Sequence, residues 1–74
     1  MSEYGVVLFH TTSSALRAEG TLQRAGLTIK LIPTPRQFSS DCGIALRFDW
    51  ADVEAVTAQL QGAGVEHAGI RRLD

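Results

Sequence analysis

Apolar and polar positions along the chain divide it into short segments with two different periods. Four runs have the β-branched and aromatic residues, or the two-residue alternation, that are typical of strands; they cover residues 4–10, 27–32, 43–48 and 65–73. Two other segments repeat apolar residues at helical spacing. One covers residues 13–25, and the other begins after Asp49 and is ended by Gly62 and Gly64. The predicted order of elements is therefore βαββαβ.

The two faces of the first strand are both apolar, with Val6 and Leu8 on one and Val7 and Phe9 on the other. A strand with this pattern is typical of the centre of a sheet, covered on both sides. The third strand places Ile44, Leu46 and Phe48 on one face and Ala45 and Arg47 on the other.

Residues at the helix ends fit the helical prediction. Any hydroxyl of residues 11–14 can cap the first helix, and Gly26 can take the left-handed conformation that ends it. We expect Asp49 to cap the second helix and Asp52 to place a carboxylate in its first turn, where the helix dipole favours negative charge.

This order describes one ferredoxin-like α+β domain over residues 1–74, a four-stranded antiparallel sheet with both helices on one face. The other face would carry Val7 or Leu8, Ala45 and Arg47, and nothing in the chain is left to cover it. Because small domains seldom leave such a patch bare, we expect a homodimer that pairs sheet to sheet.

Composition narrows the classes of function. Apolar residues make up 45%, as in an ordinary globular protein, and the formal net charge is −1 without a long run of one sign. Neither a nucleic-acid footprint nor a polybasic membrane anchor is indicated. A single cysteine fits a reducing cytoplasmic location. We expect no metal and no cofactor, since the two histidines lack a second thiol and residues 11–14 lack the glycines and lysine of a phosphate loop.

Cys42 is the residue most suited to covalent chemistry. It ends a long connection rich in turn residues that begins at Pro33, and it precedes a predicted strand. The polar residues before it predict an accessible thiol, and Gly43 lets a ligand or another backbone approach. The competing interpretation is a small buried hydrophobe, which is how free cysteines usually behave.

Other residues would decide whether the thiolate forms. Arg36 is the nearest cation in the connection, and Asp41 would act in the opposite direction if its carboxylate points at the sulfur. His10, at the end of the first strand, could activate the thiol if the two junctions lie at the same end of the sheet, or it could be a structural histidine.

The segment from Ile32 to Phe48, with its Pro-Thr-Pro-Arg loop leading into Ser-Ser-Asp-Cys-Gly and an apolar strand, resembles the selenium/sulfur carrier protein-like family. The resemblance extends over essentially the whole chain and is most specific from Pro33 to Gly43.

The resemblance implies that Cys42 carries sulfur or selenium as a persulfide or selenopersulfide, between a desulfurase-type donor and an acceptor enzyme. Such a protein is a carrier or accessory protein and not a self-sufficient enzyme. The alternative function is a non-catalytic dimeric module that binds a small ligand or a protein, in which Cys42 is structural.

Overall fold

The computed structural model describes residues 3–38 and 42–73, and it contains the predicted βαββαβ order. The strands are β1 (Tyr4–Leu8), β2 (Ile29–Pro33), β3 (Ile44–Asp49) and β4 (Gly69–Leu73). The helices are α1 (Thr12–Arg24) and α2 (Val53–Gly62), and a short 3₁₀ turn, η1 (Trp50–Asp52), precedes α2.

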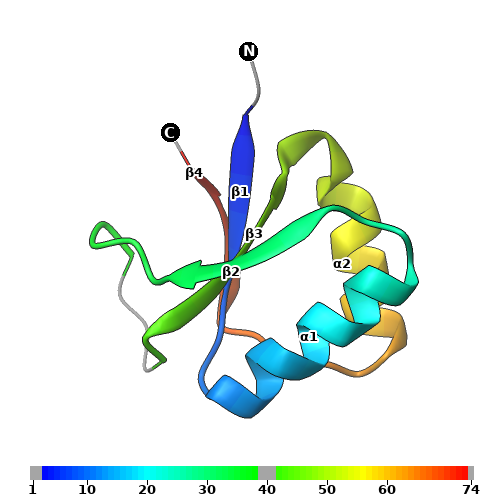
Figure 1. Cartoon of the computed structure of the whole chain (residues 1–74), viewed down its shortest axis with the longest axis horizontal. Coiled ribbons are helices and arrows are strands. Elements are labelled where there is room, and N and C mark those ends of the chain that lie inside the picture. Colours follow the sequence, from blue (N-terminus) through cyan, green and yellow to red (C-terminus); the bar gives the residue numbers. More distant parts are fainter. Residues whose placement is uncertain (1–2, 39–41, 74) are drawn as a thin grey trace.

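The four strands form one antiparallel sheet in the order β2-β3-β1-β4, with both helices packed on the same side (Figure 1). The predicted ferredoxin-like layout is therefore confirmed. β1 lies in the interior of the sheet between β3 and β4, as its two apolar faces indicated.

The helix-facing side of the sheet contains the larger part of the core. Val7 of β1 and Phe9, which follows β1, pack there with Leu46 and Phe48 of β3. All four side chains are almost completely buried. Helical residues at the predicted spacing complete this layer, namely Ala15, Ala18, Leu22, Val56 and Leu60. The alternation of the strands thus assigned the faces of β1 and β3 correctly.

Both helices end in the same way. After α1, Gly26 has φ +81°, the Gly26 N–H donates to the Gln23 carbonyl, and the Leu27 N–H donates to the Leu22 carbonyl. After α2, Gly64 has φ +65° and the Val65 N–H returns to the Leu60 carbonyl. These are Schellman-type endings, and each needs a residue that tolerates positive φ.

The start of the second helix differs from the prediction. Asp49 precedes η1 and Asp52 precedes α2, yet neither carboxylate forms a capping hydrogen bond. The 3₁₀ turn moves the start of α2 away from Asp49, so the expected cap is wrong. At the first helix the prediction holds, because the Thr11 hydroxyl accepts a hydrogen bond from the Ser14 N–H at 3.1 Å.

The expectation that nothing covers the second face of the sheet is also wrong. Val6, Leu8 and Ala45 form a small buried cluster there, against which Ile32, Phe38 and Leu73 pack. Phe38 comes from the connection between β2 and β3, so that connection supplies the cover. Val7 faces the helices, and Leu8 is the residue on this side.

Gly5 is required by packing and not by its backbone conformation. A Cβ at Gly5 would lie 2.6 Å from both the Phe48 Cζ and the Trp50 Cε3 atoms. We expect Gly5→Ala to lower the free energy of unfolding by about 1–3 kcal/mol, because both rings must move. Gly62→Ala is the control, since its Cβ would meet nothing within 4 Å. Urea titrations of both variants would measure this, and equal midpoints would contradict it.

Candidate site around Cys42

The register of the sheet places three chain junctions at one end. Leu8 at the end of β1 lies opposite Ala45 near the start of β3, and also opposite Gly69 at the start of β4. The segment that leads from β1 into α1 therefore lies beside the segment that leads into β3. The condition for His10 and Cys42 to lie at the same end of the sheet is met.

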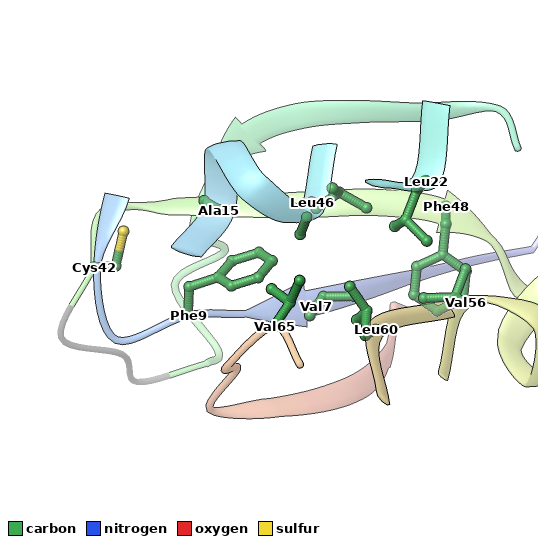
Figure 2. Close-up of a cluster of buried hydrophobic side chains, with 11 residues drawn as sticks. Val7, Phe9, Ala15, Leu22, Cys42, Leu46, Phe48, Val56, Leu60 and Val65 are labelled. Carbon is green, nitrogen blue, oxygen red and sulfur yellow. The ribbon is translucent and has the colours of Figure 1, made fainter. Parts of the chain in front are cut away.

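Cys42 lies in the last turn before β3, at the edge of the core and beside the segment leading from β1 into α1 (Figure 2). Only 6% of its surface is exposed, so the expected accessible thiol is wrong for this structure. The thiol reaches the apolar layer because the antiparallel pairing of β1 with β3 brings residue 42 against the N-terminal turn of α1.

The Thr12 hydroxyl lies beside the thiol. Its Oγ1 atom lies 3.7 Å from the Cys42 Sγ atom, and either atom can be the donor. Thr12 is the first residue of α1 and is itself exposed. The sulfur therefore contacts a residue that is itself at the surface.

The position of the sulfur has two opposing electrostatic consequences. The N-terminal turn of a helix favours an anion, through N–H groups that have no partner inside the helix and through the aligned peptide dipoles. Burial among apolar side chains disfavours the charged form. The Cys42 Sγ atom therefore lies between the first residue of α1 and the apolar core.

The backbone around Cys42 is fixed by Thr34, the residue that follows β2. The Thr34 hydroxyl donates to the Cys42 carbonyl at 2.9 Å, and the Thr34 N–H donates to the Gly43 carbonyl at 3.1 Å. Gly43 is exposed, and a Cβ there would meet nothing within 4 Å. That a ligand approaches at this point stays a prediction.

Arg36 is not placed against the thiol. It is exposed in the turn closed by the Phe38 N–H and the Pro35 carbonyl, and no ion pair or hydrogen bond of Arg36 occurs in the described part of the chain. Its role beside the sulfur stays a prediction. Asp41 lies outside the described residues. His10 is exposed on the segment between β1 and α1.

Two residues at this end of the sheet were missed by the sequence. Thr12 was one of four interchangeable hydroxyls until the β1–β3 pairing placed it against the sulfur. His67 precedes β4, and its Nδ1 atom is buried without a hydrogen-bond partner among the residues described. The weak alternation after Gly64 gave no indication of the position of His67. No group of three or more metal-binding side chains was found in residues 3–38 and 42–73.

Fold and site together define a small α+β domain that holds its single cysteine at the N-terminal turn of a helix. The chain matches the family model described as "Putative Se/S carrier protein-like" over residues 4–72, and it belongs to that family. No curated protein and no solved structure gives a significant match. None of the helices described is long and apolar enough to cross a membrane.

The contact between Thr12 and Cys42 can be tested by isosteric substitution. If the hydroxyl stabilises the reacting sulfur anion, Thr12→Val should slow alkylation of native Cys42 by iodoacetamide, by up to about tenfold. Thr12→Ser keeps the hydroxyl and is the control. Intact-mass time courses would give the rates, and equal slowing in both variants would assign the effect to packing.

Proposed function

We propose that this protein is a cytoplasmic sulfur or selenium carrier that holds the transferred atom on Cys42 as a persulfide or selenopersulfide. The observation that supports this most directly is the position of the Cys42 Sγ atom, at a helix N-terminus and 3.7 Å from the Thr12 hydroxyl. Membership of a family named for this activity supports it from the sequence side.

The chemistry requires no further catalytic group. The Cys42 thiolate attacks the outer sulfur of a persulfide on a donor protein, a new S–S bond forms at Cys42, and the donor leaves as a thiolate. One sulfur atom changes partner without net oxidation or reduction. The reverse reaction with an acceptor thiolate releases the atom. A selenopersulfide donor would transfer selenium in the same way.

Burial of Cys42 is compatible with a carrier that protects its cargo. An S–S bond is about 2 Å long, so the outer atom extends beyond Sγ by that distance. Directed past Thr12, it would reach the surface, while the inner sulfur would remain sheltered from solvent thiols. The donor and acceptor would approach beside Gly43, where the structure has open space.

A second function is favoured by one observation, the 6% exposure of Cys42. In this alternative the thiol is a core side chain, and the protein is a dimeric module that binds a ligand or a protein elsewhere. The pairing of sheets proposed for the dimer is less favourable than the sequence indicated. Phe38 already packs on the apolar centre, and Lys30, Arg47 and Arg71 share that face by register.

Loading of Cys42 in the native state separates the two functions. We expect glutathione persulfide to add one sulfur atom to the folded wild-type protein, and we expect no addition to Cys42→Ser. The addition should be reversed by a thiol reductant, because the bond formed is a persulfide. Intact mass spectrometry would measure all three results. Loading only after denaturation would contradict the carrier and leave the binding module.

The approach beside Gly43 gives a second variant for the same assay. Gly43→Val should slow loading several-fold, because its side chain fills open space at the residue that follows Cys42. Its free energy of unfolding should stay within about 0.5 kcal/mol of wild type, as expected for an exposed site away from packed neighbours. Unchanged loading in a folded Gly43→Val variant would place the approach elsewhere.

A further inference from the structure

A groove of about 440 Å³ lies at the opposite end of the sheet from Cys42. Its lining comes from three strands. Tyr4 begins β1, Ile29 and Lys30 begin β2 with Thr28 directly before them, and Arg47, Phe48 and Asp49 end β3. Arg47 lies five residues along the chain from Cys42, about 17 Å in an extended strand. The groove is therefore separate from the thiol.

Lys30 and Arg47 place two positive charges side by side in this groove. They are direct partners in the pairing of β2 with β3, and like charges at such positions destabilise a sheet. Neither forms an ion pair within the described residues. Arg71, the other cation of the same face, turns back and donates to the carbonyl of Ile70. Two adjacent cations that form no ion pair are explained if an anion binds between them.

The Arg47 guanidinium is held in position. Its Cζ atom lies 4.4 Å from the centre of the Tyr4 ring, and this cation–π contact restricts a long side chain that would otherwise be mobile. A preorganised guanidinium binds a carboxylate or phosphate with a smaller loss of entropy than a free one. The Tyr4 ring adds an apolar surface beside the charge.

Asp49 limits how strongly such a groove can bind an anion. It lines the groove and shares the sheet face of Arg47, but its carboxylate does not cap the following 3₁₀ turn. Its negative charge partly offsets Lys30 and Arg47, and it would repel an anion at its own end of the groove. Removing that charge should therefore strengthen anion binding, which is the opposite sign to the loss of either cation.

From these observations we propose that the groove is a binding site for a small organic anion. Its carboxylate or phosphate group lies between Lys30 and Arg47, and its apolar part lies against Tyr4. The volume is within the range of small-molecule sites, roughly 300–1,000 Å³. This site is independent of the chemistry proposed for Cys42.

The test is a titration of the full chain, isotopically labelled, with phenyl phosphate and with benzoate, followed by amide chemical shifts. Phenol is the uncharged probe. We expect saturable shifts at Tyr4, Lys30, Arg47 and Phe48 with one or both anions and none with phenol. The stronger of the two anions identifies a phosphate ester or a carboxylate as the natural ligand chemistry. Affinity should fall with added salt, because the attraction is between exposed charges.

Charge variants test the proposal, because they should change the affinity for the anion in opposite directions. Lys30→Gln should weaken binding by about tenfold, and Asp49→Asn should strengthen it by about threefold. Arg17→Gln removes an exposed cation from α1 and should change nothing, as should Cys42→Ser, which separates this result from the carrier proposal. Shifts that do not saturate, equal effects of Lys30→Gln and Arg17→Gln, or weaker binding by Asp49→Asn would overturn the site.

Discussion

The antiparallel pairing of β1 with β3 is the interaction on which both the fold and the candidate site depend. It joins the two βα units at the centre of the sheet and sets Val7 against Leu46 and Leu8 against Ala45. The same register brings the last turn before β3 to the first turn of α1. A shift of one residue would reverse the faces of β3, and Leu46 and Phe48 would leave the core.

Features that depend only on neighbouring residues in the chain were predictable from the sequence. The faces of β1 and β3 follow from two-residue alternation, and the helix ends follow from Gly26 and Gly64, whose positive φ no other residue type adopts as easily. The cap at Asp49 failed for a reason that is also local. A 3₁₀ turn of three residues intervenes, and nothing in the sequence distinguishes it from the first turn of a helix.

The parts that were not predictable depend on contacts between distant segments. The burial of Cys42 depends on α1, thirty residues earlier in the chain, where Thr12 meets the sulfur. A polar run before a cysteine indicates exposure only if no other element packs on it. Phe38 shows the same dependence on distant contacts. It is an aromatic residue in a loop, and it packs on the second face of the sheet. Both errors arise because burial depends on the whole fold, whereas hydropathy is counted over neighbours in sequence.

The two ends of the sheet differ in chemistry, and this difference follows from the path of the chain. At the end where β1 leads into α1, a helix N-terminus meets a sheltered thiol. At the other end, both described helices lie on the opposite side of the sheet from Lys30, Arg47 and Tyr4, so the long cationic side chains stay within reach of solvent. Charged groups remain effective for binding there because their hydration is not lost on folding. The cargo and the anion that we propose would therefore occupy opposite ends of the sheet, and neither site would enter the packing of the other.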